Sequence, residues 1–139
     1  MPRTAELESD GLIVRFEATN QELENCILLA ERDLSVADST ADADWAFNIA
    51  YNAMLQAGRA WMFSQGFRPR GETGHVAVVQ FAGATLGKDA AGFVAIFDSM
   101  RRKRHRAVYD EPGIVSGQEV RSALSAAKAF LALVKRKIG

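Results

Sequence analysis

The sequence predicts a single all-α domain, folded as an up-and-down bundle of four to five helices. Apolar residues recur every three or four positions through several long segments, which is the spacing of one helix face. Thr19–Glu22 and Ser116–Glu119 have the Ser/Thr-x-x-Glu pattern of a capping box at a helix start. The 139 residues are 48% hydrophobic, so one domain can bury a core without disulfides or metals.

The chain divides into an N-terminal arm, residues 1–19, which we expect to be partly ordered, and a helical domain, residues 20–139. In the arm, Met1–Asp10 is polar and is expected to fray, and Leu12–Phe16 favours a short strand or an extended segment. In the domain, helices are expected over residues 20–36, 41–64, 75–85, 89–109 and 116–138.

The first two helices and the segment after them have distinct signals. The first helix follows the capping box at Thr19 and ends at a polar break, Ala37–Thr40. The second helix lacks proline and carries apolar residues around most of its circumference, which is typical of a central helix or a dimer contact. Gly66–Gly74 holds three glycines and a proline, which predicts a loop.

The last three helices differ in how clearly the sequence defines them. In the short helix 75–85, the cluster Val76–Val79 also favours a strand, and Leu86–Lys88 is a break. The fourth helix ends before Pro112 and Gly113, which are stop signals. The last helix starts at the second capping box and ends in three basic residues, which suit the negative end of the helix dipole.

Charge and composition exclude several classes of function. Seventeen basic and 17 acidic residues give no net charge, so any contact with nucleic acid needs a local patch. The lone cysteine, Cys26, is expected to be buried and fits a reducing cytoplasm. No apolar run approaches the length of a membrane span, so no membrane partner is expected. One cysteine and the distant His75 and His105 offer no ligand spacing, so neither metal nor cofactor is expected.

A cation interrupts an apolar face near the end of the fourth helix. At about 100° per residue, one stripe of this helix contains Phe93, Phe97, Met100, Arg104 and Val108. An unpaired buried charge is costly, so Arg104 needs a partner. In one interpretation it pairs with a carboxylate such as Asp44 or Asp110, or extends to solvent. In the other it is presented to a phosphate, whose oxygens match the planar guanidinium fork.

Further basic and titratable residues surround Arg104. Arg101, His105 and Tyr109 lie four residues apart on the adjacent stripe, and five of the six residues 101–106 are Lys or Arg. An anionic partner would relieve the repulsion within this run, and His105 can act as an acid or a base near neutral pH. The simpler interpretation of a charge run is a solvated helix face.

The remaining histidine and the aromatic residues have simpler interpretations. His75 follows Gly74 and is expected to help cap a helix or to lie at the surface. Four aromatic residues at helical spacing are expected in the core or in a dimer contact, with an RNA-stacking platform as the alternative. They are Trp45, Tyr51, Trp61 and Phe63.

Over residues 20–137 the chain resembles the HEPN superfamily (higher eukaryotes and prokaryotes nucleotide-binding domain). Ala50–Met54 with Gly58–Ala60 resembles the aromatic, alanine-rich helix of small prokaryotic HEPN proteins, and Gly66–Pro69 with Gly74–His75 resembles their glycine-containing loop. Arg104–Asp110 resembles the active-site segment of the family.

The resemblance implies a HEPN-like bundle that forms a homodimer and binds RNA or nucleotides. Active members are metal-independent endoribonucleases, often toxins of toxin–antitoxin or other defence systems with a partner protein encoded nearby. Their motif is Arg, a polar residue, usually three further residues, and His. Arg104 and His105 match its first two positions, but Tyr109 stands where the family has His. A tyrosine, with a pKa of about 10, is a poor base at neutral pH.

Three hypotheses therefore stay open. In the one that we favour, the patch binds RNA or a nucleotide without a requirement for cleavage. In the second, the chain is an active endoribonuclease, and in the third it is a non-catalytic dimerisation or partner-binding module. The candidate catalytic residues are Arg104, His105 and Tyr109, and the candidate nucleic-acid-binding residues are Arg101, Arg102, Lys103 and Arg106.

Overall fold

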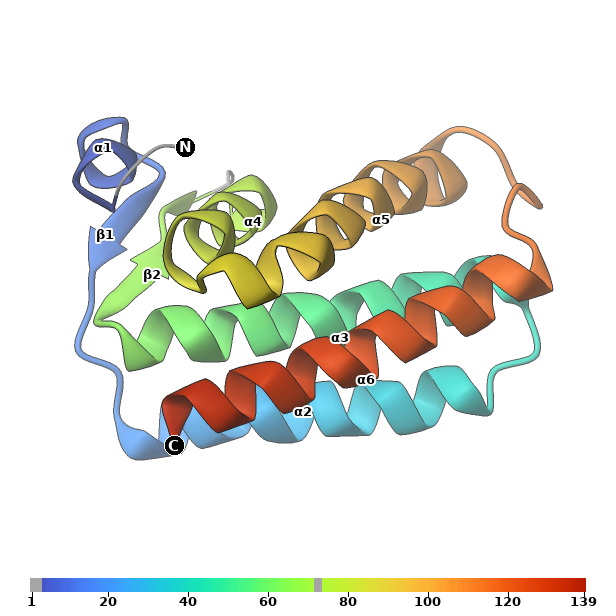
Figure 1. Cartoon of the computed structure of the whole chain (residues 1–139). Helices are drawn as coiled ribbons and strands as arrows, with labels where there is room; N and C mark the ends of the chain where they lie inside the picture. The colour runs from blue at the N-terminus through green and yellow to red at the C-terminus, as the bar shows by residue number, and fades with distance from the viewer. Residues whose placement is uncertain (1–3, 72–73) are drawn as a thin grey trace.

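The computed structural model describes residues 4–71 and 74–139, and this part of the chain is mostly helical (Figure 1). Its helices are α1 (Thr4–Ser9), α2 (Asn20–Asp38), α3 (Ala43–Ser64), α4 (Gly74–Thr85), α5 (Ala91–Tyr109) and α6 (Gly117–Ile138). A short 3₁₀ turn, η2 (Lys88–Ala90), precedes α5. The strands β1 (Ile13–Arg15) and β2 (Phe67–Pro69) form a small antiparallel sheet.

The four long helices α2, α3, α5 and α6 alternate in direction along the chain (Figure 1). Helix α3 is central, because it packs against α2, α4, α5 and α6. The prediction of an all-α bundle of four to five helices is confirmed in part, because the described residues are mostly helical but also form α1 and a two-stranded sheet. Of this sheet, only the strand within Leu12–Phe16 was expected. A central α3 also explains why apolar residues surround most of this helix.

Both predicted capping boxes form, and they set where α2 and α6 begin. The Thr19 hydroxyl accepts from the Glu22 backbone N–H at 3.0 Å, and the Glu22 carboxylate accepts from the Thr19 N–H at 3.0 Å. Ser116 and Glu119 make the same pair of bonds, at 3.1 and 3.0 Å. These side chains satisfy N–H groups that a helix start otherwise leaves unpaired.

The N-terminal arm is more ordered than predicted. We expected Met1–Asp10 to fray, but residues 4–9 form α1, and residues 1–3 lie outside the described part. The reason is Leu7, which is 1% exposed and belongs to the core. Ile13 is also fully buried, and β1 pairs with β2 inside the segment that we predicted to be a loop. The loop prediction was therefore wrong for Phe67–Pro69.

A glycine on α3 lets α4 approach closely. A Cβ at Gly58 would collide with Cγ1 of Val78 on α4 and would lie 3.5 Å from the Phe97 ring on α5. Val78 and Val79 are buried on a helix, so the strand alternative for Val76–Val79 was wrong. The close crossing at Gly58 places the start of α4 beside the middle of α3.

Two further side-chain predictions can be compared with the structure. Cys26 is buried, as expected, and burial raises the pKa of its thiol above the ordinary range. Tyr51 and Trp61 lie in the core, whereas Trp45 is 59% exposed, so for Trp45 only the predicted alternative of a dimer contact stays open. Within residues 4–71 and 74–139, no helix is long and apolar enough to cross a membrane.

Candidate functional site

Most cations of the basic run on α5 already have carboxylate partners. Arg101 and Arg102 both contact Asp98, at 3.1 and 3.6 Å. Arg106 contacts Glu111 at 3.4 Å. The expected repulsion within the run is therefore relieved by acidic side chains of the chain itself.

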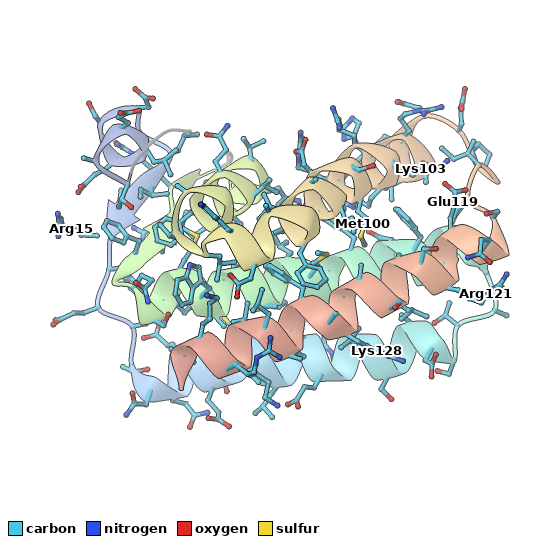
Figure 2. The ribbon with its side chains drawn as sticks, in the orientation of Figure 1. Arg15, Met100, Lys103, Glu119, Arg121 and Lys128 are labelled. Carbon is cyan, nitrogen blue, oxygen red and sulfur yellow. The ribbon has the colours of Figure 1, made fainter. Side chains whose placement is uncertain are left out.

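Lys103 lies on another side of α5 from the rest of the candidate site. Its ammonium is 3.0 Å from the Glu119 carboxylate, and Figure 2 shows this pair between α5 and the start of α6, near Met100. Lys103 therefore bridges two helices and does not line the cleft described below.

Arg104 differs from its basic neighbours in its partners. Its Nε donates to the Asn48 side-chain oxygen of α3 at 2.8 Å. Its guanidinium carbon lies 5.8 Å from the centres of both the Tyr51 and the Tyr109 rings. No carboxylate of the described residues pairs with it. The guanidinium is thus oriented by an amide and two aromatic rings, and no carboxylate of residues 4–71 and 74–139 offsets its charge.

The predicted carboxylate partners of Arg104 are engaged elsewhere or do not reach it. Asp44 accepts from the backbone N–H groups of Gly113 and Val115, at 2.6 and 3.4 Å, and so holds the α5–α6 connection to the start of α3. Asp110 follows α5 as its C-cap and makes no pair with Arg104. The interpretation in which Arg104 pairs with either carboxylate was therefore wrong.

The apolar stripe on α5 leaves the core at Arg104. Phe97 and Met100 are buried, but Val108 is 39% exposed and Ala107 is the buried residue near the helix end. Arg104 is half-buried at this boundary. Its position lets the side-chain stem pack against protein while the head group reaches a cleft.

This cleft has a volume of about 300 Å³ and is lined by His75, Arg101, Arg104, His105 and Tyr109. Four of the five lining residues were candidates in the sequence. Arg102 and Arg106 are exposed on α5, and neither they nor Lys103 line the cleft. His105 and Tyr109 are both exposed, with ring centres 4.9 Å apart.

His75 is the lining residue that the sequence interpretation placed elsewhere. It does not simply lie at the surface, because it is half-buried and its Nδ1 is 2.9 Å from the Tyr51 hydroxyl. Burial, followed by the charges of Arg104 and Arg101, lowers the pKa of His75 below 6.5. His75 is therefore neutral at neutral pH.

Tyr51 and His75 are both uncharged at neutral pH. Burial raises the pKa of Tyr51 to about 12, so its hydroxyl keeps its proton at neutral pH. One of the two groups donates to the other, and which one donates depends on the histidine tautomer. In the described part of the chain Nε2 of His75 has no partner, so this nitrogen is available to a ligand.

Three residues of the site were not assigned to it from the sequence: Asn48, Tyr51 and His75. One feature of the sequence could have identified Asn48: it is a polar residue three positions before Tyr51, on a helix rich in apolar residues. No feature of the sequence could have identified His75, because its position at the cleft depends on the crossing of α4 over Gly58. No group of three or more His, Cys, Asp or Glu residues suited to a metal occurs among the described residues.

Comparisons with known proteins identify no relative: no family model, no curated protein and no solved structure matches this chain.

Proposed function

We propose that this protein is HEPN-like and binds RNA or a nucleotide by holding a phosphate in the cleft at Arg104. The observation that carries the proposal is the uncompensated Arg104 guanidinium, which Asn48 orients at the edge of that cleft. A planar guanidinium can donate two parallel hydrogen bonds to a phosphate. Arg101 adds a second cation, although Asp98 offsets part of its charge.

The test compares two arginine variants on the same helix. Binding of a fluorescein-labelled, mixed-sequence single-stranded RNA is followed by fluorescence anisotropy in EDTA at several salt concentrations. We expect Arg104→Met to weaken binding about tenfold or more, because a charge-assisted hydrogen-bond pair is lost. Arg106→Met removes the same charge from a side chain that lies outside the cleft and contacts Glu111, and we expect a much smaller effect. Equal weakening by both variants, or no binding by the wild type, would overturn the proposal.

A second candidate function is metal-independent RNA cleavage, which the presence of two histidines in the cleft favours. In this reaction the RNA 2′-oxygen attacks the adjacent phosphorus and the bond to the 5′-oxygen breaks, which leaves a 2′,3′-cyclic phosphate and a 5′-hydroxyl. Neutral His75 would accept the 2′-hydroxyl proton at Nε2, and His105 would give a proton to the leaving oxygen. Arg104 would stabilise the added negative charge.

In this candidate His75 supplies the base that Tyr109 cannot supply. The productive tautomer has Nδ1–H donating to the Tyr51 oxygen, which leaves the Nε2 lone pair for the proton. Cleavage assays in EDTA should then show cyclic-phosphate products that disappear in His75→Gln. If the wild-type protein binds the RNA but leaves it intact, the cleavage function is rejected and the binding function is retained.

The homodimer, the toxin–antitoxin or defence role and the nearby partner belong to this proposal through the HEPN resemblance. The cytoplasmic location belongs to it through the lone cysteine, Cys26. Exposed apolar side chains that a second copy could cover include Leu28, Val36 and Trp45. Light scattering of the purified protein tests the dimer. Growth arrest on expression, relieved by the product of an adjacent gene, tests the defence role.

A further inference from the structure

A second hollow lies next to the Arg104 cleft, and His75 lines both. Its volume is about 490 Å³, which is within the range of small-molecule sites. Its side chains come from segments far apart in sequence: the end of the arm, the starts of α2 and α4, the C-terminal half of α3, and β2. The lining residues used below are Phe16, Glu22, Arg59, Phe63, Arg68 and His75.

Two guanidinium groups and two aromatic rings lie next to one another along this hollow, with the Phe16 and Phe63 rings tilted by 51°. The Arg68 guanidinium lies over the Phe16 ring at 5.7 Å, and the Phe16 and Phe63 ring centres are 5.3 Å apart. The Arg59 guanidinium lies over Phe63 at 5.5 Å. Phe16, Phe63 and Arg59 are half-buried, and Arg68 is exposed. Flat faces of this kind are the surfaces on which unpaired RNA bases stack.

The hollow offers a hydrogen-bond acceptor for the edge of a base as well as two cations. The two arginines are accompanied by Glu22, whose carboxylate is occupied at one oxygen by the capping bond to the Thr19 N–H. A carboxylate repels a phosphate but accepts hydrogen bonds from the N–H groups at a base edge. Leu55 and Pro69 add apolar wall. The Arg104 cleft, by contrast, has no acidic lining residue among those described.

We propose that the hollow bordered by Phe16, Phe63, Arg59 and Arg68 binds one nucleobase of a single-stranded RNA whose backbone phosphate lies in the Arg104 cleft. The shared residue His75 places the two subsites next to each other, as the base and phosphate of adjacent nucleotides require. The base subsite rests on the proposed function, because the phosphate subsite provides the anchor. It adds an affinity for unpaired bases that a phosphate site alone does not have.

The experiment uses a six-nucleotide RNA in which each position in turn is 2-aminopurine or abasic. Stacking quenches 2-aminopurine fluorescence, so one position should be quenched on binding, and an abasic residue there should weaken binding about tenfold. In Arg68→Ala and in Phe63→Leu the quenching should disappear, and an abasic residue at that position should no longer weaken binding. Thermal melts followed by circular dichroism check that Phe63→Leu folds, and the exposed Arg68 gives an independent variant.

Arg15→Ala is the matched control. Arg15 is also an exposed arginine over a ring, at 5.5 Å from Phe67, and it lies on the strand paired with β2. It contacts Glu8, does not line the hollow, and points away from the body of the molecule in Figure 2. We expect this variant to bind and quench like the wild type.

The outcomes separate the two proposals. RNA binding that depends on Arg104 but is unaffected by abasic residues, Arg68→Ala and Phe63→Leu would overturn the base subsite and leave the phosphate site. The same loss in Arg15→Ala as in Arg68→Ala would also overturn it, because the effect would then be one of surface charge. Absence of any RNA binding would overturn both.

Discussion

Asp33 and Arg104 are charged side chains held by two asparagines of α3, Asn52 and Asn48, but their surroundings differ. Asp33 on α2 is 5% exposed. One of its oxygens accepts from Asn52 at 2.6 Å and the other from Arg32 at 2.9 Å. Arg104 on α5 is half-buried and bonds to Asn48 through Nε alone. Its two terminal nitrogens have no acceptor in the part of the chain that the structure describes.

The difference separates a polar contact whose groups are used within the chain from one that leaves donors open to a ligand. Both oxygens of the Asp33 carboxylate are used by the chain, so it can only link α2 to α3. Asn48 fixes the direction of Arg104 but leaves most of its donors open towards the cleft. An oriented cation with open donors is the arrangement that a phosphate site needs. Six variants, two of which are controls, test this contrast.

The largest expected effect is the loss of the Asp33–Asn52 bond. Asn52→Ala should lower the free energy of unfolding by about 1.5–3 kcal/mol, because a buried carboxylate loses a hydrogen bond. Urea denaturation measures the change. Asn48→Ala is the matched control on the same helix, and it should cost less than about 1 kcal/mol, since Arg104 can reach water. If both variants lost the same free energy of unfolding, the contrast between Asp33 and Arg104 would not hold.

The next largest effect is expected from Gly58→Ala, which alters the Arg104 side of the molecule through α4. A new Cβ would overlap Val78, and overpacking costs about 1–3 kcal/mol, partly offset by about 1 kcal/mol of helix propensity. We therefore expect a net loss of about 1 kcal/mol in urea denaturation, with altered His75 signals in NMR spectra.

Gly92→Ala is the control for this substitution. Gly92 is also in a helix, but nothing lies within 4 Å of its added Cβ. This variant should gain stability, by up to about 1 kcal/mol. A stabilising Gly58→Ala would show that α4 does not depend on the close crossing.

A smaller effect on the free energy of unfolding is expected for Arg104→Met, although we expect this variant to weaken RNA binding about tenfold or more. Methionine keeps an unbranched stem against the tyrosine rings and removes an uncompensated charge. We expect the free energy of unfolding to change by less than about 1 kcal/mol. If urea denaturation instead showed a loss as large as that of Asn52→Ala, Arg104 would be a structural residue like Asp33.

The smallest effect is expected from the titration of His75. Its pKa in the folded chain is lowered below the ordinary value of 6.5, so the unfolded chain binds the proton more tightly. Stability is therefore highest above pH 6.5 and falls as the pH drops from there towards the folded pKa. Urea midpoints measured across this window should vary less in His75→Gln.

The same titration links His75 to Arg104. In Arg104→Met the NMR-detected pKa of His75 should rise, because one repelling charge is gone while the burial remains. A His75 pKa above 6.5 in the wild type would contradict the buried position that we describe.

The helices were predictable because their signals are local. Both capping boxes lie within four consecutive residues, and the starts of α2 and α6 follow from them. The same locality explains the errors. The polar sequence of residues 4–9 does not show that Leu7 is buried by helices distant in sequence. Likewise, nothing local indicates that Phe67–Pro69 pairs with Ile13–Arg15.

The sequence by itself determined the long helices α2, α3, α5 and α6, and it placed Arg101, Arg104, His105 and Tyr109 on one side of α5, because helix periodicity depends on neighbours along the chain. The carboxylate partners of Arg101, Arg102 and Arg106 are their neighbours along the chain, Asp98 and Glu111. The tertiary structure decided that Lys103 is paired with Glu119 and that Arg104 is held by Asn48. The tertiary structure alone also brought His75 to Tyr51, because their contact requires α4 to cross α3 where Gly58 has no side chain.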